Sequence, residues 1–141
     1  MPIHTLPAGT YWIGDPCYLV ADEDWDELLR TTGFFGLPDH SSTNWDDGLF
    51  EYKGGTCFAW GTSYGDGLFS LLDDQRQEVA ELGVDAGLLG ILPDTGVVPT
   101  LMYKVTFDED FEVWERNGLF YFGGYTVDTN IWSWVKGDDD E

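Results

Sequence analysis

Residues 101–131 read LMYKVTFDEDFEVWERNGLFYFGGYTVDTNI, and this stretch decides the fold class. Apolar and polar residues alternate over residues 101–107 and again over residues 125–131, which is the pattern of a strand with one buried face. Between these two runs stands Asn117-Gly118, a dipeptide favoured in two-residue hairpin turns because both positions adopt positive φ there. The stretch therefore predicts antiparallel strands joined by tight turns.

The same turn signal, followed by Leu-Phe, occurs twice earlier in the chain. The three copies are Asp47-Gly48-Leu49-Phe50, Asp66-Gly67-Leu68-Phe69 and Asn117-Gly118-Leu119-Phe120. Their unequal spacing argues against a solenoid repeat, so we expect three hairpin corners. Short β-prone runs at Thr10–Ile13 and Cys17–Val20 flank a Gly-Asp-Pro turn, and residues 77–84 favour a strand over a helix.

One helix is expected, over residues 22–32. Asp22 can cap its N-terminus, and the acidic residues of its first turn suit the positive end of the helix dipole. Trp25, Leu28 and Leu29 are spaced as one apolar stripe of a helix. The predicted fold class is therefore α+β: a mainly antiparallel β-sheet, arranged as a sandwich or half-barrel, with this short helix packed against it.

The composition indicates one packed domain with an unusual surface. The 141 residues carry 27 acidic and 6 basic side chains, a formal net charge of −21, while 43% of the residues are hydrophobic and 16% are aromatic. We expect a single compact domain over residues 1–136 and a disordered acidic tail over residues 137–141. The core should include Trp25, Leu28, Leu29, Phe58, Trp60, Val105, Phe107 and Val127.

The charge limits the classes of partner. So many carboxylates repel the backbone of nucleic acid and anionic lipid, which excludes direct binding to either as the main function. No run is long and apolar enough to cross a membrane, and the N-terminal residues lack the features of a secretory signal. We therefore expect a cytoplasmic protein in which Cys17 and Cys57 are reduced.

Three short motifs occur in the first two thirds of the chain. YWIGDPCY at residues 11–18 precedes the acidic, tryptophan-containing helix, and TSYGDG at residues 62–67 and VDAG at residues 84–87 follow. In combination, over roughly residues 9–95, they resemble a group of small uncharacterised bacterial and phage proteins. The resemblance implies a compact β-rich domain that is often encoded by mobile elements, and no activity comes with it.

Catalytic and metal chemistry have weak signals. Cys17 could act as a nucleophile if His4 or His40 approached it, but the surrounding negative charge should raise the pKa of its thiol. The histidines and cysteines lack the paired spacing of a zinc site. We expect no cofactor and no bound metal. A candidate cation loop consists of Asp46, Asp47 and Asp66, whose oxygens would suit calcium.

The remaining pattern is an array of carboxylates. Asp108, Asp110 and Glu112 alternate as they would along one face of a strand, about 6.6 Å apart, a spacing comparable with that of successive phosphates. The sequence therefore predicts a non-enzymatic acidic interaction protein, a phage-encoded inhibitor or DNA mimic that blocks a basic site of a nucleic-acid-handling or host-defence protein. The alternatives are a structural (virion) or housekeeping protein from a high-salt organism and a small hydrolase that uses Cys17.

Overall fold

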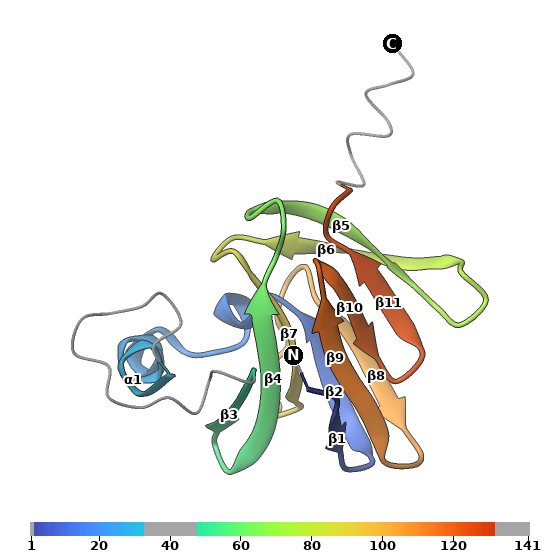
Figure 1. Cartoon of the computed structure of the whole chain (residues 1–141). Coiled ribbons are helices and arrows are strands. Elements are labelled where there is room, and N and C mark those ends of the chain that lie inside the picture. The colour runs from blue at the N-terminus through green and yellow to red at the C-terminus, as the bar shows by residue number, and fades with distance from the viewer. Residues whose placement is uncertain (1, 33–47, 132–141) are drawn as a thin grey trace.

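In the computed structural model, residues 2–32 and 48–131 are described, and they form two antiparallel β-sheets with a helix beside them (Figure 1). The strands are β1 His4–Leu6, β2 Gly9–Gly14, β3 Leu49–Tyr52, β4 Gly55–Gly61, β5 Gly67–Leu72, β6 Glu78–Val84, β7 Leu88–Pro93, β8 Tyr103–Phe107, β9 Phe111–Arg116, β10 Leu119–Phe122 and β11 Tyr125–Asp128. The helices are a 3-10 helix, η1 Pro16–Tyr18, and α1 Asp22–Thr32. The predicted α+β class, mainly antiparallel β with one short helix, is confirmed.

The chain passes repeatedly between the two sheets. One sheet has the order β1-β9-β10-β11-β5-β6 and the other has the order β3-β4-β7-β2-β8. The connections after β1, β4, β6 and β8 therefore cross from one sheet to the other. The facing apolar sides of the sheets form the main core, which includes Leu6, Ile13, Phe58, Phe69, Leu82, Ile91, Val113, Phe120, Phe122 and Val127. This arrangement is a β-sandwich.

A second apolar cluster holds η1 and α1 against the outer face of the β3-β4-β7-β2-β8 sheet. Leu28 of α1 is buried, and Trp25 packs against the same cluster. The apolar stripe predicted for this helix is thus confirmed for these two residues, while the side chain of Leu29 lies outside the described part. Neither helix in the described ranges has the length and hydrophobicity that a membrane crossing requires.

The predicted hairpin corners have three different outcomes. Asn117-Gly118 joins β9 to β10 with φ values of 52° and 87°, as the hairpin signal requires. Asp66-Gly67 is not a hairpin, because Gly67 begins β5 while β4 belongs to the other sheet. Asp47 lies outside the described residues. Asp66-Gly67 instead ends a connection between the two sheets, and the dipeptide alone does not distinguish this geometry from a tight turn.

Two tight turns that the sequence analysis did not identify complete the sheets. Lys53-Gly54 joins β3 to β4, and Gly123-Gly124 joins β10 to β11, in each case with both residues at positive φ. The strand predicted over residues 77–84 is confirmed as β6, which begins one residue later, at Glu78. The alternation over residues 125–131 is shorter than expected, because β11 ends at Asp128.

A glycine at the centre of the β3-β4-β7-β2-β8 sheet supplies a test of the packing. A Cβ atom on Gly90 would overlap the carbonyl oxygen of Phe58 and lie 2.7 Å from the Cβ of Ala59. We expect Gly90→Ala to lower the free energy of unfolding in urea by about 2–3 kcal/mol, because strand backbone must move to relieve the overlap. Gly61→Ala is the control, since its Cβ would meet only the carbonyl oxygen of Gly87, at 3.8 Å. Equal stability of the two variants would contradict this packing.

Candidate functional site

The three motif segments meet at one corner of the sandwich. YWIGDPCY covers the end of β2 and η1, TSYGDG forms the connection from β4 to β5, and VDAG forms the connection from β6 to β7. The N–H of Thr62 donates to the carbonyl of Gly87 at 3.1 Å. The Cβ position of Gly87 lies 3.8 Å from Oδ1 of Asp66. The motifs are thus far apart in sequence and adjacent in the fold.

The carboxylate of Asp15 is the centre of this corner. Its side chain is fully buried, and its oxygens accept the backbone N–H groups of Cys17 at 2.9 Å, Asp85 at 2.8 Å and Ala86 at 2.7 Å. Burial raises the pKa of Asp15, while the three backbone donors act in the opposite direction. The carboxylate therefore fastens η1 to the connection that carries the chain from β6 into β7.

Asp15 also explains why Cys17–Val20 is not the predicted strand. Its side chain accepts the N–H of Cys17 as an N-cap, and Pro16 supplies a φ suited to the first helical position. The N–H groups of Leu19 and Val20 both donate to the carbonyl of Pro16. The segment is therefore a 3-10 turn, and the β-prone side chains of the run pack as part of the second cluster instead.

Cys17 does not have the surroundings of a nucleophile. Burial, and next the negative charge of Asp15, raise the pKa of its thiol to about 12, so the reactive thiolate is scarce at neutral pH. The predicted direction of the shift is confirmed, although burial contributes more than charge. His4 lies on β1 with its ring 5.9 Å from that of Phe58, and His40 is outside the described residues. Cys57 is buried, and both thiols are free.

The candidate cation loop is not assembled in the described part of the chain. Asp66 is exposed in the connection from β4 to β5, and Asp46 and Asp47 lie outside the described ranges. Within residues 2–32 and 48–131, no group of three histidine, cysteine or carboxylate side chains is placed to hold a metal ion.

The acidic segment between β8 and β9 is exposed, but it does not form the predicted strand array. Asp108 and Asp110 lie in the connection between the sheets, and only Glu112 belongs to β9. The alternation is interrupted there because the rings of Phe107 and Phe111 stack, with centroids 3.7 Å apart, as the chain crosses. The acidic edge, defined here as Asp108, Glu109, Asp110 and Glu112, therefore follows a bend.

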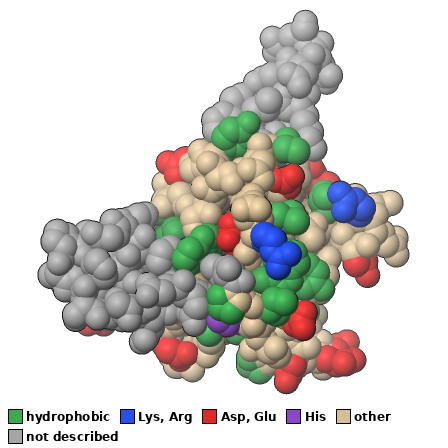
Figure 2. All heavy atoms as spheres, in the orientation of Figure 1, with side chains coloured by type: hydrophobic (Ala, Val, Ile, Leu, Met, Phe, Trp, Pro, Cys, Tyr) green, Lys and Arg blue, Asp and Glu red, His purple; other side chains and the backbone are tan. Residues whose placement is uncertain are grey.

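The acidic edge is anchored at both ends. Phe107 and Phe111 hold the connection against the core, and Oδ1 of Asp110 accepts the N–H of Ala8 at 3.0 Å. Figure 2 shows acidic side chains gathered at the lower right, over the region where Figure 1 places this connection. The sequence analysis identified three of its members and missed Glu109, which is also exposed.

The acidic edge borders a cavity of about 280 Å³. Asp108 lines it together with residues of β8, the turn between β5 and β6, and the turn between β10 and β11. The lining residues are Asp73, Asp74, Val105, Thr106, Phe107, Asp108, Gly123, Gly124 and Tyr125. The sequence analysis did not associate Asp73 and Asp74 with Asp108, because only the order of the strands brings these segments together.

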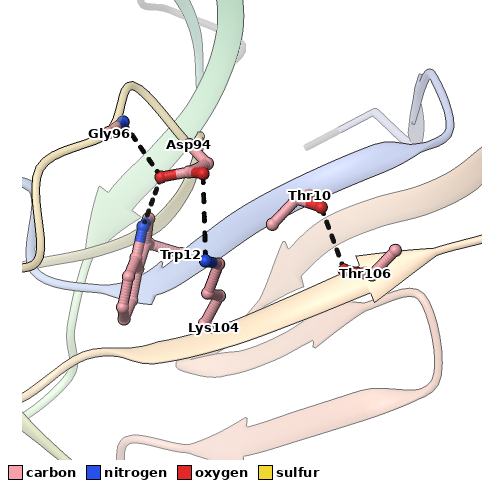
Figure 3. Close-up of polar contacts among 6 residues, drawn as sticks. All are labelled: Thr10, Trp12, Asp94, Gly96, Lys104 and Thr106. Carbon is pink, nitrogen blue, oxygen red and sulfur yellow. Dashed lines mark hydrogen bonds and ion pairs between the residues drawn. The ribbon is translucent and has the colours of Figure 1, made fainter.

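Several basic side chains of the protein lie over aromatic rings. The Nζ of Lys104 is 5.7 Å from the centre of the Trp12 ring and 4.0 Å from Oδ2 of Asp94. The indole N–H of Trp12 donates to Oδ1 of Asp94 at 3.1 Å (Figure 3). The N–H of Gly96, then this indole and the Lys104 charge, lower the pKa of Asp94. Lys53 lies over Tyr52 and Arg116 over Trp114 in a similar way.

Comparisons with known proteins gave no match: no family model, no curated protein and no solved structure is similar to this chain.

The role of Asp15 can be tested by replacing one carboxylate oxygen with an amide nitrogen. In Asp15→Asn, an N–H₂ group would face at least one backbone N–H that now has an acceptor, so we expect a loss of about 1–3 kcal/mol in the free energy of unfolding. Asp85→Asn is the matched control, because Asp85 takes part through its backbone N–H and its side chain is exposed. Urea denaturation measures both, and an unchanged Asp15→Asn variant would show that the contact contributes little.

The state of Cys17 can be tested by alkylation. At pH 8 we expect iodoacetamide to label Cys17 in the native protein at least about tenfold more slowly than in urea, because a raised thiol pKa leaves little thiolate and burial limits access. Peptide mass spectrometry would follow this residue separately from Cys57. Native labelling as fast as that of the unfolded chain would instead indicate an activated cysteine.

Proposed function

We propose that this chain is a non-enzymatic acidic interaction protein that covers a basic, nucleic-acid-binding site of another protein, as a phage-encoded inhibitor or DNA mimic would. The observation that carries the proposal is the acidic edge, which places four exposed carboxylates on one anchored bend. Sites that bind phosphates are lined with lysine and arginine. An anchored set of carboxylates can occupy such a site and release counterions as DNA does.

The wider surface supports the same proposal. Apart from Asp15, every carboxylate side chain that the structure describes is at least partly exposed. The basic side chains described are Lys53, Arg76, Lys104 and Arg116, too few to neutralise this surface. A strongly negative surface attracts a basic partner over a distance of about a Debye length and repels nucleic acid itself.

The hydrolase alternative receives no support from Cys17, whose side chain is half-buried and whose thiol pKa is raised by burial and by the charge of Asp15. The proposed function requires a basic partner, whereas adaptation of a protein to high salt requires none. Recovery of a partner therefore decides between them. The protein would be immobilised and exposed to host lysate in low salt, and bound proteins would be displaced with duplex DNA. Failure to recover any nucleic-acid-binding protein would count against the proposal.

The acidic edge can then be tested on the recovered partner. We expect Asp108→Asn/Asp110→Asn/Glu112→Gln to slow association by about tenfold at 0.1 M salt and to change dissociation much less, because steering by charge acts before contact. Stopped-flow or surface-plasmon measurements would give both rates.

The control for this variant removes the same charge elsewhere. Glu23→Gln/Asp26→Asn/Glu27→Gln alters exposed side chains of α1, which lies away from the β8–β9 connection in Figure 1. We expect this control to slow association by less than about threefold. The carboxylates that it removes lie away from the acidic edge, so salt screens much of their attraction for a partner bound there. Equal slowing by both variants would show that net charge, and not the acidic edge, determines the encounter.

A further inference from the structure

The cavity beside the acidic edge combines aromatic walls with a carboxylate rim. Phe107 and Tyr125 are both half-buried, and their rings meet at 85° with centroids 6.2 Å apart. Asp74 and Asp108 are exposed at the rim. Asp73 is held in place, because its Oδ1 accepts the N–H groups of Gln75 and Gln77, both at 2.9 Å. The cavity thus presents negative charge next to aromatic rings.

The turn between β10 and β11 packs closely against the wall of this cavity. A Cβ on Gly123 would lie 2.5 Å from Cε1 of Phe107, so a side chain there would displace the ring. A Cβ on Gly124 would have the Cβ of Asp74 at 3.9 Å as its nearest neighbour, so the space beside Asp74 is bounded by bare backbone. Burial raises the pKa of Tyr125, and so do its electrostatic interactions, first with the Tyr103 phenol as that group ionises and then with the carboxylates of Asp73 and Asp74. The carboxylates are therefore close enough for their charges to act on this ring.

The same combination elsewhere in the protein already holds a cation. At Trp12 and Asp94, an indole ring and a carboxylate together contact the ammonium group of Lys104 (Figure 3). The cavity offers an aromatic pair and three carboxylates, and none of the described residues that line it is basic. Attraction between a cation and a ring is strengthened by partial desolvation and by adjacent negative charge. Within the described part of the chain, the cavity therefore has the chemistry of a cation site and no basic side chain in its lining.

We propose that this cavity receives the guanidinium group of one arginine side chain on the basic partner. About 280 Å³ is below the usual size of a site for a drug-sized ligand and suits a single side chain. Arginine is favoured over lysine because its planar group stacks on aromatic rings, is weakly hydrated and can bond two carboxylate oxygens at once. Such an arginine would be an anchor of the interface, with the acidic edge as its rim. The proposal rests on the proposed function, since it names the chemistry by which the same surface recognises its partner.

The cavity can be tested without the partner. The probes are Nα-acetyl-arginine methylamide and the corresponding lysine derivative, each titrated into the ¹⁵N-labelled protein in 0.15 M NaCl. We expect the arginine probe to shift the amide resonances of Asp74, Gly123, Gly124 and Tyr125, with a Kd of about 1 mM. The lysine probe should bind at least about threefold more weakly.

Two double variants with the same net charge locate the binding. Asp74→Asn/Asp108→Asn removes two exposed carboxylates from the rim, and we expect it to raise the Kd at least about fivefold. Asp66→Asn/Asp85→Asn removes two exposed carboxylates at the motif corner, and its Kd should change less than about twofold. Equal weakening by both variants, shifts spread over the whole acidic surface, or equal binding of the two probes would overturn the proposal.

The partner separates this inference from the proposed function. A DNA-displaceable partner that binds wild-type protein and Asp74→Asn equally would refute the arginine site and leave the proposed function standing. Site-specific arginine binding without any DNA-displaceable partner would refute the proposed function and leave the cavity as a guanidinium site. Asp74 suits this comparison because it lies outside the acidic edge.

Discussion

The buried carboxylate of Asp15 fastens the turn after β2 to a connection that carries the chain from one sheet to the other. The residues it joins lie on η1 and on the connection from β6 to β7, about 70 positions later in the sequence. A carboxylate in this position is costly to desolvate, and the hydrogen bonds that it accepts from three backbone N–H groups offset that cost. The contact is therefore reciprocal: the turn positions the acid, and the acid satisfies the turn.

Local patterns predicted the elements that depend on local physics. The alternation around Val105 and the Asn117-Gly118 turn indicated strands and a hairpin, and the stripe containing Leu28 indicated the helix. Two predictions were wrong, where a side-chain cap or the strand order determined the local structure. The turn after Asp15 is helical because the side chain of Asp15 caps it, a local effect that the β-prone composition of Cys17–Val20 obscured. Gly67 starts a strand in the opposite sheet, an outcome that is not encoded in the propensity of the residues themselves.

The candidate site shows the same division. Exposure of Asp108, Asp110 and Glu112 could be predicted from their charge. The bend of the backbone that carries them could not, because it accompanies the stacking of the Phe107 and Phe111 rings. The cavity required still more information. Asp73 and Asp74 reach Asp108 only because β11 pairs with β5 and the β8–β9 connection crosses the sandwich beside them. Strand order of this kind is a property of the whole fold.

Aspartates in this protein therefore have two separate physical roles. Asp15 is buried and accepts hydrogen bonds from backbone N–H groups, so we expect a change there to alter the stability of the fold. Except for Glu112 of β9, the carboxylates of the acidic edge and the cavity rim lie on connections between strands, where side chains contribute little to the core. Their mutual repulsion destabilises the folded chain slightly, and a cationic partner would relieve it. A surface of this kind can change its charge pattern, and with it its partner, while the sandwich beneath it stays the same.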